Sequence, residues 1–122
     1  MAPTVERIAF YGTLMRRAEN RLAVADVQPG DLELEGDCLV PGELYHLGNY
    51  PGLVEGDGAV PGELHRIRNP EVLAKLDEFE GVPENLYHRK AVVLTSPEIV
   101  AWVYYYSRPV AGLRRLAAWP PR

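Results

Sequence analysis

One glutamate of this 122-residue chain falls on the apolar side of an expected helix. The helix is expected to open at Asn69-Pro70 and to run from Glu71 to Glu80. At roughly 100° per residue, one side of it carries Val72, Leu73, Leu76, Phe79 and Glu80. A carboxylate directed at the core is costly if it is ionised and unpaired, so it must be paired, protonated or solvated within a site. Its pKa can then rise toward neutrality, as a proton-transfer catalyst requires.

Periodicity leaves a second interpretation of this glutamate open. The run from Asp77 to Gly81 is also typical of a solvated helix end, at which Gly81 caps the last turn. Because the ends of a helix are the part that sequence locates least well, the pattern alone does not choose between a buried Glu80 and a solvated one.

A second candidate feature is the segment Tyr11-Gly12-Thr13-Leu14, which follows the first expected strand, Arg7 to Tyr11. A glycine at a strand end lets the backbone turn sharply and present successive N–H groups to a carboxylate or a developing oxyanion. Any strand-to-loop turn can contain Gly-Thr, so this segment does not define a site by itself.

The elements that must position these residues are mainly strands. Between Leu32 and Ile67 the chain is rich in Gly and Pro, a pattern that predicts many short strands in a curved or closed sheet. After the helix, strands are expected from Tyr87 to Thr95 and from Ile99 to Tyr106. The second has apolar residues on both faces, which indicates a central strand. A further helix is expected from Ala18 to Val27.

A five-residue motif occurs twice, as Val40-Pro41-Gly42-Glu43-Leu44 and as Val60-Pro61-Gly62-Glu63-Leu64. Two copies are too few for a repeat architecture. We interpret them as two strand beginnings of the same kind, with Pro at the first strand residue and Gly permitting a close approach of the backbone.

Composition and charge restrict the class of protein. The formal net charge of -4 argues against nucleic acid or an anionic membrane as a partner, since either would need a basic surface. No apolar leader or membrane-spanning stretch is recognisable, so a cytoplasmic protein is expected. The single cysteine, Cys38, excludes an internal disulfide and a cysteine-based zinc site. The length predicts one domain, residues 1–122.

Together, the motifs resemble those of the γ-glutamyl cyclotransferase-like superfamily, including its AIG2-like and γ-glutamylamine cyclotransferase branches. The matching stretches occur in the family's order and cover most of the chain: Phe10 to Leu14, Asn49 to Val54, Val60 to Leu64, and Leu76 to Gly81 with Leu86 to Arg89. The resemblance implies an α+β fold, namely a γ-glutamyl cyclotransferase-like mixed β-barrel with flanking helices.

The same resemblance implies a site. Glu80 matches the family's catalytic glutamate. The loop that holds the γ-glutamyl moiety through backbone groups is matched by Tyr11, Gly12, Thr13 and Leu14. Tyr87 either lines the pocket or serves to close the loop behind the glutamate. The implied reaction releases 5-oxoproline without a metal or an organic cofactor.

The leading hypothesis is a γ-glutamyl cyclotransferase that acts on a small γ-glutamyl amine, amino acid or peptide, with Glu80 as general acid and base. The substrate's α-amine would attack its own side-chain carbonyl after giving a proton to Glu80. The alternative is a non-catalytic module that keeps the pocket to bind a small carboxylate or a partner protein. A third hypothesis is an enzyme that removes a γ-glutamyl protecting group from a biosynthetic intermediate. The leaving amine and the oligomeric state are not specified by the sequence.

Overall fold

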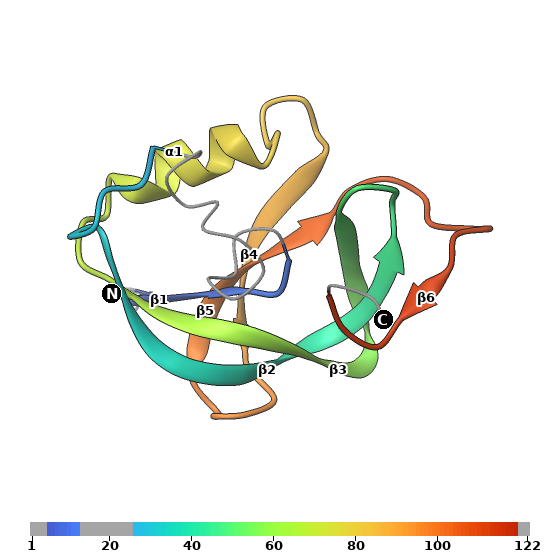
Figure 1. Ribbon diagram of the computed structural model, residues 1–122, viewed down its shortest axis with the longest axis horizontal. Coiled ribbons are helices and arrows are strands. Elements are labelled where there is room, and N and C mark those ends of the chain that lie inside the picture. The colour runs from blue at the N-terminus through green and yellow to red at the C-terminus, as the bar shows by residue number, and fades with distance from the viewer. Residues whose placement is uncertain (1–4, 13–25, 120–122) are drawn as a thin grey trace.

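A mixed β-sheet dominates the computed structural model, which describes residues 5–12 and 26–119 (Figure 1). The strands in these residues are β1 (Arg7–Phe10), β2 (Leu32–His46), β3 (Pro51–Ile67), β4 (Tyr87–Val93), β5 (Val100–Tyr106) and β6 (Arg115–Leu116), and the helix is α1 (Val72–Phe79). The strands form one sheet in the order β4-β5-β1-β3-β2-β6. Strand β1 runs parallel to β5, and the other neighbouring pairs are antiparallel. The predicted α+β class is confirmed.

The sheet is curved but not closed, and in the described residues β4 and β6 are its two edges. It is therefore not the closed form of the barrel that the resemblance implied. Its curvature nevertheless brings the turn after β4 against β2. There the Leu39 N–H donates to the Ser96 carbonyl at 2.7 Å, and the Thr95 N–H donates to the Leu39 carbonyl at 3.0 Å.

Strands β2 and β3 form one long hairpin, so the prediction of many short strands in this region was wrong. The two strands pair from Leu32 with Ile67 to His46 with Pro51, and their register shifts twice, near Gly36 and near Gly42. Such β-bulges bend a strand and increase its twist without ending it. Figure 1 shows the result: both strands sweep beneath α1 and then turn upward toward their connecting turn.

The repeated five-residue motif lies inside this hairpin. One copy lies in β2 and the other in the antiparallel strand β3, and the two copies meet where Val40 pairs with Val60. The prolines are therefore within the strands, which corrects our interpretation of them as first residues. Pro41 lies directly before a register shift, a place where a strand tolerates proline. The close approach expected at glycine is present, because a Cβ on Gly62 would lie 2.7 Å from the Phe10 carbonyl oxygen.

Two hydrophobic clusters cover the two faces of the sheet. The first includes Ala9, Tyr11, Cys38, Val40, Leu44, Leu53, Val103 and Tyr105. The second contains Ile8, Phe10, Val27, Val72, Leu76, Tyr87 and Tyr104, and thus packs α1 against β1 and β5. Successive residues of β5 alternate between the clusters, and β5 lies between β4 and β1. The central position predicted for this strand is confirmed.

Helix α1 agrees closely with the helix expected from residue 71 to residue 80. Val72 and Leu76 are fully buried, Leu73 is partly buried, and Ala74 and Glu78 on the other side are exposed. Burial of a Leu or Val side chain stabilises the fold by about 1.5–3 kcal/mol, so this face fixes the rotation of the helix on the sheet.

The helix predicted from Ala18 to Val27 falls mostly outside the described residues. Its last two residues are described, and Asp26 lies in a turn with φ 62°, so a helical conformation does not continue through that end. In residues 5–12 and 26–119, no helix has the length and apolar character needed to cross a membrane.

Candidate active site

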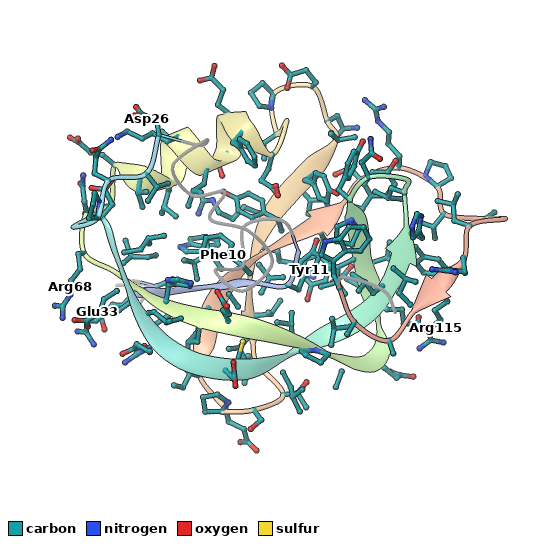
Figure 2. The ribbon with its side chains drawn as sticks, in the orientation of Figure 1. Phe10, Tyr11, Asp26, Glu33, Arg68 and Arg115 are labelled. Atoms are coloured by element: carbon teal, nitrogen blue, oxygen red, sulfur yellow. The ribbon has the colours of Figure 1, made fainter. Side chains whose placement is uncertain are left out.

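A cavity of about 180 Å³ lies at the carboxyl end of α1. Pockets for drug-sized ligands usually measure about 300–1,000 Å³, so this one suits a smaller molecule. Several separate elements contribute its walls, including the end of β1, where Figure 2 labels Phe10 and Tyr11. Within the described part of the chain, the lining consists of Ala9, Phe10, Tyr11, Gly12, Tyr50, Pro51, Phe79, Glu80, Leu86, Tyr87 and Tyr104.

The helix end that carries Glu80 is closed by a Schellman motif. Glu80 is the C-cap residue, and Gly81 follows with φ 72°, a conformation that glycine adopts without the strain a Cβ would add. The Gly81 N–H donates to the Glu78 carbonyl at 3.1 Å, and the Val82 N–H donates to the Asp77 carbonyl at 2.9 Å. Both interpretations of the sequence were partly right, because Gly81 caps the helix while Glu80 lines the cavity.

The Glu80 carboxyl has an unusual affinity for protons. Burial raises its pKa from 4.5 to about 7. Its position at the carboxyl end of α1 acts in the same direction, because the last carbonyl groups of a helix carry partial negative charge. A carboxyl with such a pKa can take up and return a proton near neutral pH, which is the requirement for general acid–base chemistry.

Three buried tyrosines form walls of the same cavity: Tyr11, Tyr87 and Tyr104. The Tyr11 hydroxyl donates to the Tyr104 carbonyl at 2.5 Å, and the Tyr87 hydroxyl donates to the Pro51 carbonyl at 2.6 Å. Burial raises the pKa of all three hydroxyls, so they stay protonated at neutral pH. Since their protons are donated within the protein, these hydroxyls can offer a ligand only the lone pairs of their oxygens.

A hydrogen-bond network joins the last turn of α1 to β4 and β5. Arg89 donates to the two carboxylate oxygens of Asp77, from Nε at 2.8 Å and from Nη2 at 3.2 Å. The Tyr104 hydroxyl donates to Asp77 Oδ1 at 2.7 Å. The Arg89 guanidinium also lies over the Trp102 ring, 4.2 Å from its centroid. Because Asp77 is one helical turn before Glu80, the network holds the segment that carries Glu80 against the sheet.

Sequence analysis missed this network and the presence of Tyr50 in the cavity wall. Two spacings were available as signals. Asp77 and Glu80 are three residues apart on a helix, and Tyr87 and Arg89 are two residues apart on a strand, so each pair shares a side. No local pattern links Tyr50 to Glu80, because they meet only through the fold.

The structure brings four of the predicted site residues to one cavity: Tyr11, Gly12, Glu80 and Tyr87. At Gly12 a Cβ would lie 2.8 Å from Cγ of Pro51, so this position requires glycine for a close approach. The predicted residues Thr13 and Leu14 lie outside the described residues. Residues 5–12 and 26–119 contain no group of three or more His, Cys, Asp or Glu side chains that could hold a metal ion.

Comparison with known proteins places the chain in a family. Residues 8–119 match the family model described as "Gamma-glutamyl cyclotransferase, AIG2-like". The chain belongs to this family, and the resemblance found in its motifs is confirmed.

Individual relatives support the same assignment. The "Gamma-glutamylcyclotransferase family protein YtfP" of Escherichia coli strain K12 is 38% identical over 109 residues, which are 88% of each chain. The solution NMR structure of ytfP from Escherichia coli has a TM-score of 0.67 at 34% identity, covering 93% of this chain and 96% of that one. The crystal structure of an AIG2-like protein from Mus musculus has a TM-score of 0.75 at 23% identity, covering 96% of this chain and 89% of that one, and shows the fold alone.

Proposed function

We propose that the protein is a γ-glutamyl cyclotransferase that releases 5-oxoproline from a small γ-glutamyl compound, with Glu80 as general acid and base. One observation carries the proposal. A carboxyl with a pKa of about 7 lines the same cavity as Gly12, the glycine at the turn after β1. Family membership supports the reaction class, and the shared cavity of Glu80 and Gly12 supports the proposed pairing of a proton carrier with an anion-binding turn.

Binding of the substrate would use both sides of this cavity. In this proposal, backbone N–H groups at and after Gly12 hold the α-carboxylate or the oxyanion that forms at the side-chain carbonyl, and Gly12 itself lines the cavity. The substrate's α-ammonium then lies toward Glu80 and the hydroxyl oxygens of the buried tyrosines, all of which are acceptors. A substrate folded in this way has its amine next to its own carbonyl, and binding holds it in the conformation from which the ring closes.

The proton transfers balance through one residue. Ionised Glu80 takes a proton from the α-ammonium, and the neutral amine attacks the side-chain carbonyl carbon to form the five-membered ring. The bond between that carbon and the leaving nitrogen then breaks as protonated Glu80 returns the proton to the leaving amine. Ionised again, Glu80 takes the second proton of the ring nitrogen and passes it to the released amine, so the products are 5-oxoproline and the amine as an ammonium ion, and Glu80 ends in the charge state in which it began.

The test compares two glutamates of the same helix end. We expect Glu80→Gln to lower 5-oxoproline release by at least about 100-fold, since general acid–base groups typically contribute 10²–10⁴-fold. The control is Glu78→Gln, because Glu78 is exposed on the outer side of α1 and should retain wild-type turnover. Product is measured by chromatography after incubation with a panel of γ-glutamyl amides, amino acids and peptides.

The outcomes separate the proposal from its alternative. Undiminished turnover by Glu80→Gln would refute the role given to this residue. If the wild-type protein binds 5-oxoproline but turns over no member of the panel, it is a binding module that keeps the cavity, and the catalytic proposal fails.

A further inference from the structure

Tyr104 of β5 is hydrogen-bonded to two separate walls of the cavity. Its hydroxyl donates to Asp77 Oδ1 at 2.7 Å, and Asp77 lies one helical turn before Glu80. Its main-chain carbonyl accepts a hydrogen bond from the Tyr11 hydroxyl at 2.5 Å, and Tyr11 directly precedes Gly12. We call this connection the Tyr104 bridge: Asp77, Tyr104 and Tyr11. It joins the helix end that carries the glutamate to the turn after β1.

The helix end of the Tyr104 bridge is held by charge. Arg89 of β4 donates to both carboxylate oxygens of Asp77, and such two-point contacts between ionised groups are stronger and more directional than neutral hydrogen bonds. The Asp77 and Arg89 side chains are only 26% and 20% exposed. The guanidinium also packs over the Trp102 ring of β5. Asp77 therefore cannot turn away from Tyr104 without breaking its pair with Arg89.

The other end of the Tyr104 bridge is held by packing. Tyr11 is 6% exposed, and a Cβ on Gly12 would lie 2.8 Å from Cγ of Pro51. The Pro51 carbonyl in turn accepts a hydrogen bond from the Tyr87 hydroxyl at 2.6 Å. The turn at Gly12 is thus restrained by Pro51 as well as by the Tyr104 bridge, and it has little freedom to follow a displaced helix end.

The proposed reaction depends on the separation of these two walls. Glu80 must take a proton from one end of the glutamyl unit while the turn at Gly12 holds another part of the same unit. An error of about 1 Å in such an arrangement can lower a rate by about 100-fold. Resting on the proposed function, we propose that the Tyr104 bridge sets the separation between Glu80 and Gly12. In this arrangement Asp77 is a positioning residue for the reaction, although it does not line the cavity.

The first experiment measures kcat and KM of the wild-type protein, Asp77→Asn and Asp77→Ala, with the γ-glutamyl compound that the wild type turns over fastest. We expect the kcat of Asp77→Ala to fall by about 10–100-fold with KM nearly unchanged, because binding contacts survive a small displacement that ring closure does not. The amide oxygen of Asp77→Asn can still accept from the Tyr104 hydroxyl, so this variant should keep more of the wild-type kcat.

The matched control is Tyr105→Phe. Tyr105 directly follows Tyr104 in β5, is 2% exposed and does not line the cavity. Its hydroxyl donates to the Pro41 carbonyl at 2.9 Å, so the substitution removes a comparable hydrogen bond from the fold. Tyr105→Phe should retain wild-type kcat and KM, which separates a loss of stability from a loss of position.

A double-mutant cycle separates the Tyr104 bridge from direct contact between the Tyr104 hydroxyl and the substrate. Tyr104→Phe removes the donor to Asp77 and leaves the ring and the main-chain carbonyl in place. If the bridge acts as a unit, Tyr104→Phe combined with Asp77→Ala should lower kcat by clearly less than the product of the two single effects. Effects that multiply would show that the two residues act independently.

A second measurement does not depend on turnover. Burial raises the pKa of Glu80 to about 7, and a helix end released from the sheet would admit water to this carboxyl. We expect NMR titration of the Glu80 side-chain carboxyl to give a lower midpoint in Tyr104→Phe and the wild-type midpoint in Tyr105→Phe. Tyr104→Phe leaves the charges of Asp77 and Arg89 and the other tyrosines of the cavity unchanged, so a shift reports solvation of Glu80.

The outcomes distinguish this proposal from the proposed function. Wild-type kcat in both Asp77 variants, a kcat loss as large in Tyr105→Phe, or multiplying effects in the cycle would overturn the Tyr104 bridge and leave the cyclotransferase standing. If Asp77→Ala does not fold, Asp77→Asn and Tyr104→Phe decide by the same criteria. Absence of 5-oxoproline release by the wild type would overturn the cyclotransferase and the positioning role in it, whereas a lower Glu80 midpoint in Tyr104→Phe would retain the bridge as the tie that keeps Glu80 buried.

Discussion

Replacing Glu80 by glutamine should remove a pH-dependent destabilisation that the native carboxyl imposes on the fold. The pKa of this group rises on folding from 4.5 to about 7 because it is buried. Well below pH 4.5 the carboxyl is protonated in both the folded and the unfolded state, so its ionisation makes no contribution to the free energy of unfolding. Between the two pKa values the unfolded chain releases the proton first, so stability falls as pH rises. Above about pH 7 the whole penalty is present.

The size of this penalty follows from the shift. At about 1.4 kcal/mol per pKa unit, the change from 4.5 to about 7 corresponds to about 3.5 kcal/mol. Because Glu80 is partly exposed, solvent screening lowers the expected effect to about 2–3 kcal/mol. Glutamine has nearly the same shape and no charge, so any cost of burying its amide is the same at every pH.

The assay is urea unfolding of the wild-type protein, Glu80→Gln and Glu78→Gln at several pH values from 4.5 to 8. The free energy of unfolding of Glu80→Gln, minus that of the wild type, should increase by about 2–3 kcal/mol over this range. For Glu78→Gln, on the exposed side of α1, the difference should stay nearly constant. Parallel curves for Glu80→Gln and the wild type would show that the carboxyl is not buried in a proton-binding cavity, and the reasoning about Glu80 would fail.

Two further substitutions test the structure around Glu80. Asp77→Asn takes the carboxylate away from Arg89 and should lower the free energy of unfolding in urea by about 1–3 kcal/mol, whereas an unchanged midpoint would show that the pair does not hold α1 to the sheet. Tyr87→Phe leaves the buried Pro51 carbonyl without its donor and should cost about 1–2 kcal/mol, seen as a lower melting temperature; an equal or higher melting temperature would contradict the hydrogen bond.

The helix was predictable because its pattern is local. Val72 and Leu76 lie one turn apart and face the core for the same geometric reason that puts Glu80 on that side. The two long strands were not predictable in this way. Their Gly and Pro residues are typical of turns, yet Pro41 and Pro61 lie inside β2 and β3, where bulges and the pairing of distant segments accommodate them.

The site shows the same division. Tyr11, Gly12, Glu80 and Tyr87, which line one cavity, were predicted as site residues through motifs, because each motif occupies a short continuous stretch. Tyr50 and the pairing of Asp77 with Arg89 depend on contacts between a hairpin turn, a helix and a strand, so no window of sequence contains them. Sequence analysis therefore identified the Glu80 carboxyl as a candidate group, whereas only the fold shows which residues surround it.

The capped end of α1 has a consequence for the divergence of related chains. One residue inserted in α1 before Glu80 would rotate the carboxylate by about 100° and move it by about 1.5 Å along the axis, out of the cavity wall. The Schellman motif also requires a left-handed residue directly after Glu80. Substitutions at Ala74 or Glu78, on the outer side, disturb neither constraint. Catalytically competent relatives should therefore vary freely in the composition of this segment but tolerate no insertion or deletion within it.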